Sequence, residues 1–434
     1  MNRAREVNVN ALAHATWRAA KISTPRRFEG ARAIEITSFV DDAVAKALAR
    51  GARASGVAFA RARGARAAIA IANVRVDERW NERLISGKED QGEVANAGAK
   101  AALIGNCACV PVRDGELALG KSQRVFLYEF DDERETRQCE IVICAREDET
   151  SVGRGAMATP GRGFHLLARG ALPKTRGTTT TGVGTIFIQD ACASLTINEN
   201  ADPTVRVDME NAFNRIVPEG PRGEDASVKA SLIGPSARVP ISDGKLAMGT
   251  WQGVYLNEHR SVDSVERGHS IDVVVDVDDA VAQKTIEVTA GKRGLRDITD
   301  AIKTAFDAEV LGSIGVGIVH CFVKHTSASI CVGAAGAEFE DAFEEMLNRI
   351  VPERWNSEFF THTYEGPDDM PGHVKATLVG ASVDLPVIDG ELALDDDERV
   401  YLCEHRDVGG FGCGLKRSLT LTLQGSTRAA ADNA

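Results

Sequence analysis

The sequence predicts an α+β fold in which three copies of one mostly antiparallel β unit, with few helices each, form a pseudo-threefold trimer. The first observation is an internal repeat, because residues 100–131, 229–260 and 375–406 align with one another without a gap. Self-similarity of this kind indicates repeated structural units. The second observation is that turn signals separate short β-rich segments within each repeat. Sheet edges need covering, and three fused copies most simply cover one another, as the subunits of a homotrimer do.

Within each repeat, the strands are expected to form a three-stranded antiparallel meander. The repeat opens on Lys-Ala-x-Leu, a hydrophobic residue and Gly, which we interpret as a short strand ending at the glycine. An Asp-Gly pair follows in all three copies, at 114–115, 243–244 and 389–390, and it is the strongest short hairpin signal. A β-rich segment, residues 400–404 in the third copy, completes the predicted meander.

Helices are predicted upstream of the second and third repeats. Residues 203–217 and 337–351 place apolar side chains at helical spacing, and each segment is followed by a proline that stops the helix. Apolar strands are predicted before these helices, at 184–189 and 317–323. Another helix, preceded by a strand, is predicted near the start of the third copy, with Thr299 as its N-cap.

The repeat also suggests how the chain divides. We expect a basic tail or transit segment at 1–27, degenerate unit 1 at 28–145, a linker at 146–163, partly degenerate unit 2 at 164–278 and best-preserved unit 3 at 284–426. The first segment is rich in Arg and Ala, which fits an organelle transit peptide and a plain basic tail equally well.

Composition limits the classes of partner. The net charge of −12 argues against nucleic acid, which needs concentrated Lys and Arg, and no apolar run approaches the length of a membrane span. The nine cysteines form no CxxC pair, so we expect reduced thiols in an intracellular protein, cytoplasmic or organellar. We therefore expect a small-molecule partner and a monomer that acts as a pseudo-trimer.

Polar residues that could form a site are divided between the second and third copies. The segment His-Thr-Tyr-Glu-Gly-Pro-Asp-Asp-Met-Pro-Gly-His, residues 362–373, occurs in the third copy alone. The second copy keeps polar residues at 198–203 and 249–252, where the third has bland residues or an acidic run. Each copy retains what the other has lost, which is expected when sites lie between copies and one of three is kept. The sequence thus predicts one working site between units 3 and 2.

Four blocks carry a resemblance to a known family. His-Thr-Ser-Ala-Ser at 325–329, Asn-Glu-Asn-Ala-Asp-Pro at 198–203, Glu-Gly-Pro-Asp-Asp-Met-Pro at 365–371 and Glu-His-Arg at 404–406 resemble the YjbQ-type family. This uncharacterised family is often labelled secondary thiamine-phosphate synthase. The resemblance covers nearly the whole chain as three fused copies and is strongest in the third. It implies trimer-forming α+β units, with histidines and acids near the subunit interface that would bind a divalent metal (zinc, manganese or magnesium).

The resemblance also implies roles for single residues. The metal ligands would be His362, His373, His405 and His325. The catalytic acids or bases would be Asp368, Asp369, Glu365 and Glu404. Substrate would contact Ser327, Ser329, Arg406, Asn198, Glu199, Asn200, Trp251 and Gln252.

The residues taken alone leave structural interpretations open. His362 and His373 could cap backbone groups in a proline-braced loop, because their spacing matches no standard zinc motif. The Glu-His-Arg block could be a surface ion cluster, and Trp251 could be an interface wedge.

The reaction is inferred from the family label and from absent motifs. There is no GxxxxGK[ST] and no strand–GxGxxG–helix, so nucleotide hydrolysis and dinucleotide redox chemistry are unsupported. Thiamine-phosphate synthesis joins a pyrimidine diphosphate to a thiazole phosphate and expels pyrophosphate, which requires a divalent metal and a basic group such as Arg406. We therefore expect a metal-dependent enzyme with transferase chemistry on a small phosphorylated substrate. The alternative is a non-catalytic small-molecule or metal-binding protein on a degenerate trimeric scaffold.

Overall fold

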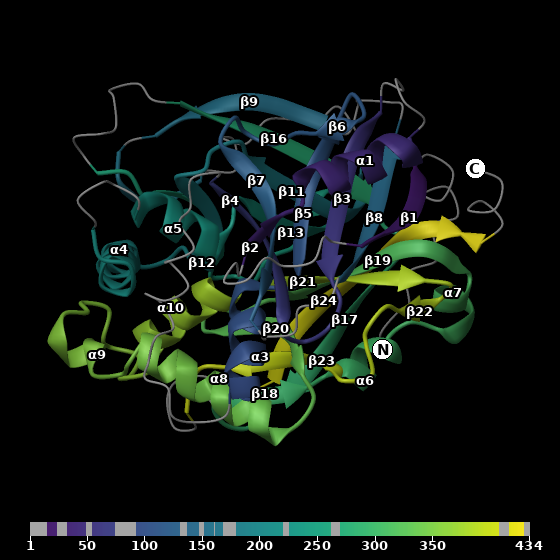
Figure 1. Ribbon diagram of the computed structural model, residues 1–434. Helices are drawn as coiled ribbons and strands as arrows, with labels where there is room; N and C mark the ends of the chain where they lie inside the picture. Colours follow the sequence, from purple (N-terminus) through teal and green to yellow (C-terminus); the bar gives the residue numbers. More distant parts are fainter. Residues whose placement is uncertain are drawn as a thin grey trace.

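The protein is an α+β chain of three repeated units, as predicted (Figure 1). The computed structural model describes residues 15–23, 33–48, 54–73, 93–130, 137–146, 152–159, 161–167, 179–219, 225–261, 270–407 and 416–428. In this part of the chain, strands are far more abundant than helices, and neighbouring strands run antiparallel.

Each unit pairs a five-stranded sheet with a three-stranded sheet. In unit 1, the five-stranded sheet has the order β1 (Thr16–Ser23), β8 (Gln138–Arg146), β3 (Ser55–Ala62), β5 (Cys107–Arg113), β6 (Glu116–Leu117). Its three-stranded sheet has the order β2 (Ala33–Glu35), β7 (Gln123–Glu129), β4 (Ala67–Asn73). In unit 2, the five-stranded sheet has the order β14 (Lys245–Leu246), β13 (Ser236–Ser242), β11 (Thr181–Ile188), β16 (Ser270–Asp279), β9 (Val152–Ala158). Its three-stranded sheet has the order β10 (Gly163–Leu166), β15 (Gln252–Glu258), β12 (Ala193–Glu199). In unit 3, the five-stranded sheet has the order β17 (Ala282–Thr289), β24 (Lys416–Thr427), β19 (Ile314–Val323), β21 (Ser382–Ile388), β22 (Glu391–Leu392). Its three-stranded sheet has the order β18 (Gly294–Asp297), β23 (Glu398–Glu404), β20 (Ala328–Ala334).

The helices lie between and beside these sheets. They are α1 (Thr37–Ala47), α3 (Glu93–Ile104), α4 (Thr204–Ile216), α5 (Asp225–Ile233), α6 (Thr299–Lys303), α7 (Ala308–Gly312), α8 (Ala337–Ile350), α9 (Trp355–Glu358) and α10 (Asp369–Val379). The predicted helices at 203–217 and 337–351 are confirmed as α4 and α8. Among the described residues, no helix is both long and apolar enough to cross a membrane.

The Asp-Gly hairpins are confirmed, but the meander is wrong. Asp114, Asp243 and Asp389 have φ between 50° and 52°, and the glycine after each also has positive φ. Two consecutive positive φ values give the tight turn that matches the twist of paired strands. The second strand of the hairpin has only two residues, as β22 does in unit 3. The chain then crosses to the other sheet. The third predicted strand, β23, is the centre of that three-stranded sheet.

The Lys-Ala-x-Leu segment is a helix, so its prediction as a strand is wrong. It forms the C-terminal part of α3, α5 and α10, and each helix ends before a glycine with φ between 92° and 101°. All described positions of α10 from Asp369 to Leu378 are buried. A helix buried on every side shows no polar face, so its short apolar run cannot be distinguished from a strand by periodicity.

Two smaller predictions need correction. Thr299 is not an N-cap, because it is the first residue of α6 and its N–H donates to Asp297 Oδ1 at 2.9 Å. Its hydroxyl instead accepts a hydrogen bond from the N–H of Val400 at 2.9 Å. The expected tail and the expected linker also contain the edge strands β1 and β9, which belong to the five-stranded sheets of units 1 and 2.

Hydrophobic side chains form one core per unit and a shared core between units. In unit 3, for example, Val319 and Leu385 from the larger sheet pack against Ile330 and Leu402 from the smaller sheet. A further cluster joins all three units and includes Ala99, Phe213, Phe343, Met370 and Tyr401. Figure 1 shows α8, α9 and α10 gathered on the same side of the molecule as α4 and α5. This shared core fixes the units relative to one another.

Each unit also holds the next through one buried side chain at the start of its β7, β15 or β23 strand. The amide of Gln123 in unit 1 donates to the backbone oxygens of Ile188 and Asp190 in unit 2, at 3.1 and 2.9 Å. Gln252 in unit 2 donates to Val323 and His325 of unit 3, at 3.0 and 2.9 Å. The third junction replaces the amide by Glu398, which forms an ion pair with Arg61 of unit 1. These contacts connect the units in a ring.

Candidate functional site

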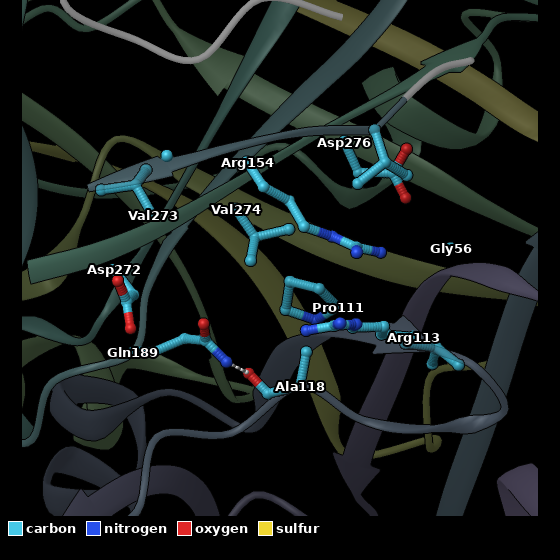
Figure 2. A pocket seen from close by; sticks show the side chains of 13 residues that line it. Gly56, Pro111, Arg113, Ala118, Arg154, Gln189, Asp272, Val273, Val274 and Asp276 are labelled. Atoms are coloured by element: carbon cyan, nitrogen blue, oxygen red, sulfur yellow. Dashed lines mark hydrogen bonds between the residues drawn. The ribbon is translucent and has the colours of Figure 1, made fainter. Parts of the chain in front are cut away.

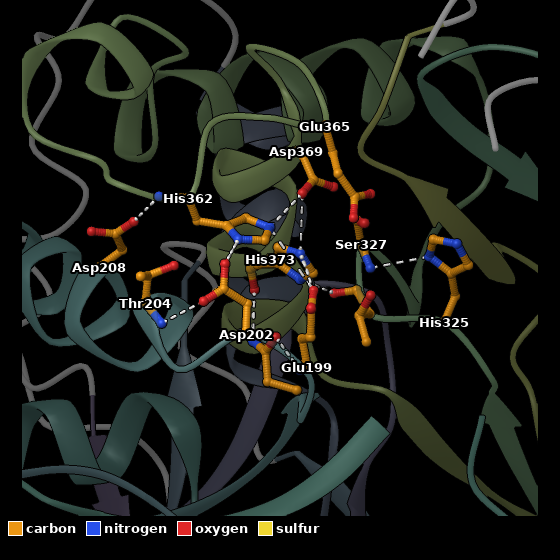
Figure 3. A network of polar contacts seen from close by, with 12 residues as sticks. Glu199, Asp202, Thr204, Asp208, His325, Ser327, His362, Glu365, Asp369 and His373 are labelled. Carbon is orange, nitrogen blue, oxygen red and sulfur yellow. Dashed lines mark hydrogen bonds and ion pairs between the residues drawn. The ribbon is translucent and has the colours of Figure 1, made fainter. Parts of the chain in front are cut away.

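The best-formed polar cluster lies at the junction of units 2 and 3 (Figure 3). His362 Nε2 is 2.9 Å from Asp369 Oδ2, and His373 Nε2 is 3.4 Å from the same oxygen. Glu199 of unit 2 completes the cluster, with its Oε2 at 3.2 Å from His373 Nε2 and 3.9 Å from His362 Nε2. The structure thus brings together four residues that the sequence placed in the site.

Helix α10 and the loop before it position the unit 3 residues. Asp369 begins the helix, and His373 lies four residues later on the same face. Gly366 has a φ of 121°, a conformation that favours glycine, and it turns the loop so that His362 and Asp369 face each other. This arrangement gives a physical role to the segment 362–373, which occurs in unit 3 alone.

Unit 2 supplies the opposite wall from the end of β12 and from α4. Asp202 Oδ2 is 2.8 Å from His362 Nδ1, and Asp208 accepts hydrogen bonds from the N–H groups of Thr361 and His362 at 2.7 and 2.8 Å. Sequence reasoning did not select Asp202 or Asp208 as site residues. Asp202 could have been found, because it belongs to the Asn-Glu-Asn-Ala-Asp-Pro block, whereas Asp208 carries no signal beyond being a buried acid in a helix.

Asn198 of unit 2 binds helix α10 through two hydrogen bonds. Its side-chain amide donates to the backbone oxygen of His373 at 3.2 Å and to Thr377 Oγ1 at 2.7 Å. The Asn198 side chain is 2% exposed, so these hydrogen bonds lie inside the protein. Its geometry fits a residue that positions α10 against unit 2.

The ionisation of the cluster follows from its hydrogen bonds. Burial lowers the pKa of His373, but hydrogen bonds to Asp369 and Glu199 outweigh it and raise the pKa to about 9. Burial also opposes a raised pKa at His362, where the hydrogen bonds to Asp369 and Asp202 prevail. Asp369 shows the reverse balance, since the two histidines hold its pKa well below the usual range despite burial. The carboxylates therefore favour the positively charged form of both histidines.

The donor set fits a divalent metal ion. Ligand atoms of Glu199, His362 and His373 lie within 4.8 Å of one another, as do those of His362, Glu365 and Asp369. In each histidine, Nδ1 contacts a second group: Asp202 for His362, and the backbone oxygen of Thr326 for His373 at 3.2 Å. Such contacts fix the ring and leave Nε2 toward the common point, the usual arrangement around metal-ligating histidines. Imidazole with carboxylate suits zinc or manganese.

Arg406 orients the acids of this cluster. Its Nη1 is 2.7 Å from Asp369 Oδ1 and 3.5 Å from Glu365 Oε2, and its Nε is 3.5 Å from Asp368 Oδ1. Asp368 also accepts from the N–H of Asp407 at 2.6 Å, which ties the loop to the end of β23. The Arg406 side chain is 3% exposed, so its guanidinium supports the acids from inside the protein.

The structure does not bring His405 or His325 into the cluster. His405 is fully enclosed, and its Nε2 is 2.8 Å from Ser329 Oγ; unit 2 repeats this pair with His259 and Ser194, also at 2.8 Å. A pair kept in both units fits a packing role. His325 Nδ1 accepts the N–H of Ser327 at 3.1 Å, and Figure 3 shows it apart from His362 and His373. Burial lowers the pKa of His325 to about 3, with Arg417 adding to the effect.

The remaining predicted residues have structural contacts. Glu404 Oε2 accepts from Arg417 Nε at 2.6 Å. Asn200 donates its backbone N–H to the backbone oxygen of Trp251 at 2.8 Å and its side-chain amide to the backbone oxygen of Gln252 at 2.9 Å. The side-chain amide of Gln252 donates to the backbone of unit 3, as described above. The Trp251 side chain is 62% exposed.

Comparison with known proteins gives a consistent result for all three units. The family model described as UPF0047 protein YjbQ-like matches residues 21–146, 162–276 and 284–426. The UPF0047 protein YjbQ of Salmonella typhimurium is 41% identical over 110 residues, which are 23% of this chain and 80% of that protein. The corresponding protein of Escherichia coli O157:H7 is 38% identical over 115 residues, 24% of this chain and 83% of its own length.

Two solved structures each match about a third of this chain. A YbjQ-like protein of unknown function from Sulfolobus solfataricus has 21% sequence identity and a TM-score of 0.28, covering 33% of this chain and 96% of its own. A protein of the YjbQ/UPF0047 family from Clostridium acetobutylicum has 27% identity and a TM-score of 0.23, covering 29% of this chain and 98% of its own.

Proposed function

The chain belongs to the YjbQ-like UPF0047 family, and from this premise we propose that it is a metal-dependent enzyme acting on a small phosphorylated substrate. The observation that carries the proposal is the convergence of His362, His373 and Glu199, drawn from two units, within 4.8 Å. Asp369, beside both histidines, would complete the ligand set.

The charge balance of the cluster supports a bound cation. The acids Glu199, Asp202 and Asp369 lie together in a largely buried space, with Glu365 at its edge. Buried carboxylates need positive partners, which the histidines and Arg406 supply here, and a divalent ion would take the place of the protons on the two Nε2 atoms. When bound, the ion would act as a Lewis acid that binds and polarises phosphate oxygens.

The chain's own groups would then hold and orient the substrate. Glu365 is the most accessible acid of the site, with 35% of its side chain exposed, and it would take a proton from a substrate group beside the ion. Arg406 would fix Asp369 and Glu365 rather than contact phosphate itself, since its guanidinium lies against these acids. For the reaction, we propose transfer chemistry like that of thiamine-phosphate synthase, with loss of pyrophosphate.

Metal content tests the proposal most directly. Untagged wild type, His373→Ala and the control His165→Ala would be compared by elemental mass spectrometry. His165 lies on β10, outside the cluster, and contacts the backbone oxygen of Gly161. We expect about one divalent ion per chain in wild type and in the control, and none in His373→Ala. A wild type that stays metal-free after exposure to zinc, manganese and magnesium would overturn the metal site.

Turnover separates an enzyme from a metal-binding protein. Metal-loaded protein would be mixed with a pyrimidine diphosphate and a thiazole phosphate, and released pyrophosphate measured. Wild type should release pyrophosphate, and Glu365→Gln, which keeps the donors of His362, His373, Glu199 and Asp369, should retain the metal but lose rate. Metal binding with no pyrophosphate release would refute the transferase proposal and favour a binding protein.

A further inference from the structure

A cavity lies at the junction of units 1 and 2, away from the histidine cluster (Figure 2). Its volume is about 350 Å³, and its walls are β5 of unit 1 together with the edge strand β9 and its neighbour β16 of unit 2. This volume is within the range of small-molecule sites. The proposed function does not use this cavity.

Two guanidinium groups, one from each unit, extend into the cavity. Figure 2 shows Arg113 on one side and Arg154 on the other, with Pro111 between them. Arg113 is half-exposed at the end of β5, where its Nε is 3.2 Å from Asp114 Oδ2. Among the lining acids, Asp276 is already bound by Arg146 at 2.6 Å, whereas Asp272 lies at the opposite end of the cavity. The arginine end therefore combines the guanidinium groups of Arg113 and Arg154 with the carboxylate of Asp276.

The corresponding places at the other two junctions are filled. Between units 2 and 3, the amide of Gln283 donates to Ile241 O at 3.1 Å and Thr422 Oγ1 at 2.9 Å. Between units 3 and 1, Trp17 packs in an apolar cluster with Ile318 and Ile388. The register of the strands makes Ser242 and Ile388 the counterparts of Arg113, and Thr285 and Lys21 the counterparts of Arg154. The pair of facing arginines thus occurs at one junction of the three.

We propose that this cavity binds a small oxyanion ligand, with a phosphate or carboxylate group held between Arg113 and Arg154. Guanidinium groups bind both kinds of oxyanion through paired hydrogen bonds. The rest of the ligand would extend toward Gln189 and Asp272, so a hydroxyl or amino group at that end would find hydrogen-bond acceptors. Gln189 is fixed there, because its side-chain amide donates to Ala118 O at 2.9 Å.

Titration calorimetry with inorganic phosphate and with citrate, each added separately, tests the proposal. The proteins are wild type, Arg113→Gln, Arg154→Gln, His373→Ala and the surface-charge control Lys121→Gln. We expect wild type, His373→Ala and Lys121→Gln to bind at least one probe equally well. Each arginine variant should bind about tenfold or more weakly, because it loses a charge-assisted contact.

The outcomes separate this cavity from the histidine cluster. Failure of both probes to bind wild type at millimolar concentration would overturn the proposal. Binding that is lost in His373→Ala and kept in both arginine variants would also overturn it, because the anion would then sit at the metal cluster. A preference between phosphate and citrate identifies the chemical class of the ligand. Both arginines have accessible side chains, so circular dichroism and thermal unfolding of the variants should match wild type.

Discussion

Arg238 of unit 2 and Asp384 of unit 3 occupy equivalent positions in their repeats, yet they form a buried ion pair with each other. Arg238 lies opposite Thr185 in the strand register, and Asp384 lies opposite His320 at the matching place in unit 3. The counterpart in unit 1 is Cys109. Three identical subunits would place like residues here, so this pair requires that the copies have diverged. Unit 1 takes part in both other junctions, and its counterpart, Cys109, cannot form this ion pair.

Asp384→Ala should therefore destabilise the protein strongly. It leaves the Arg238 guanidinium buried beside Phe59 without its carboxylate, and loss of one partner of a buried pair costs about 3–5 kcal/mol. Urea unfolding measures the change. The double variant Arg238→Met/Asp384→Leu should recover most of the loss, because no lone charge remains. A single variant within about 0.5 kcal/mol of wild type would show that the pair contributes little.

The same cluster predicts a loss of stability in acid. Burial lowers the pKa of His320 below its usual 6.5, although Asp384 opposes the shift, and Arg238 adds to the lowering. A histidine whose folded pKa is depressed stabilises the fold above 6.5, and this contribution is lost as pH falls through the folded value. Arg238 and His320 hold the pKa of Asp384 below 3.8 against the effect of burial, so its own contribution disappears only in stronger acid.

Thermal unfolding between about pH 7 and about pH 5 tests this linkage. The melting temperature of wild type should fall over this range more than that of His320→Gln, which keeps a donor for Asp384 but has no group that titrates there. Equal falls in the two proteins would contradict a role for His320. His165→Gln, on β10, serves as the matched histidine control.

The sequence predicted local turns reliably, whereas it missed several contacts between residues that are distant along the chain. Asp389 and Gly390 specify their turn locally, and the turn is as predicted. Asp208 approaches His362 only because α4 of unit 2 packs against the loop of unit 3, and no local pattern marks that contact. Arg406 was predicted to contact substrate, whereas the fold of the loop at 365–369 places its guanidinium against Asp369 and Glu365. The buried helix α10 shows no polar face, so the periodicity of its Lys-Ala-x-Leu segment does not distinguish a helix from a strand.

Among the described residues, packing at the junction of units 3 and 1 explains why the histidine cluster is not repeated there. Gly98 of unit 1 stands at the position of His373, and Phe339 of unit 3 fills the space beside it. A Cβ atom on Gly98 would lie 3.5 Å from Phe339 Cδ2, and the Phe339 ring also packs on Tyr401 at 5.4 Å. Apolar packing has thus replaced the polar cluster here.

Phe339→Ala should cost about 3–5 kcal/mol of stability, because it leaves a cavity in the core shared by the units. The metal content should stay at the wild-type value, because this junction is separate from the His362–His373 cluster. Chemical unfolding and elemental analysis of the same preparation check both expectations. Loss of the metal from a folded Phe339→Ala protein would show that the two junctions are coupled.

Arg406→Gln should weaken metal binding while the fold remains. Arg406 contacts Asp369 Oδ1 at 2.7 Å, and Asp369 Oδ2 faces both histidines, so the arginine fixes the orientation of a proposed ligand. Removing such supporting contacts typically lowers metal affinity about 10–100-fold. Unit 2 offers a matched control in Arg260, which occupies the equivalent position and pairs with Asp190 at 2.5 Å and Glu258 at 2.9 Å. Calorimetric titration with Mn²⁺ or Zn²⁺ should show weakened binding for Arg406→Gln and wild-type binding for Arg260→Gln. Equal weakening in both variants would mean that loss of positive charge anywhere in the chain is sufficient, and unchanged binding in both would remove Arg406 from the metal site.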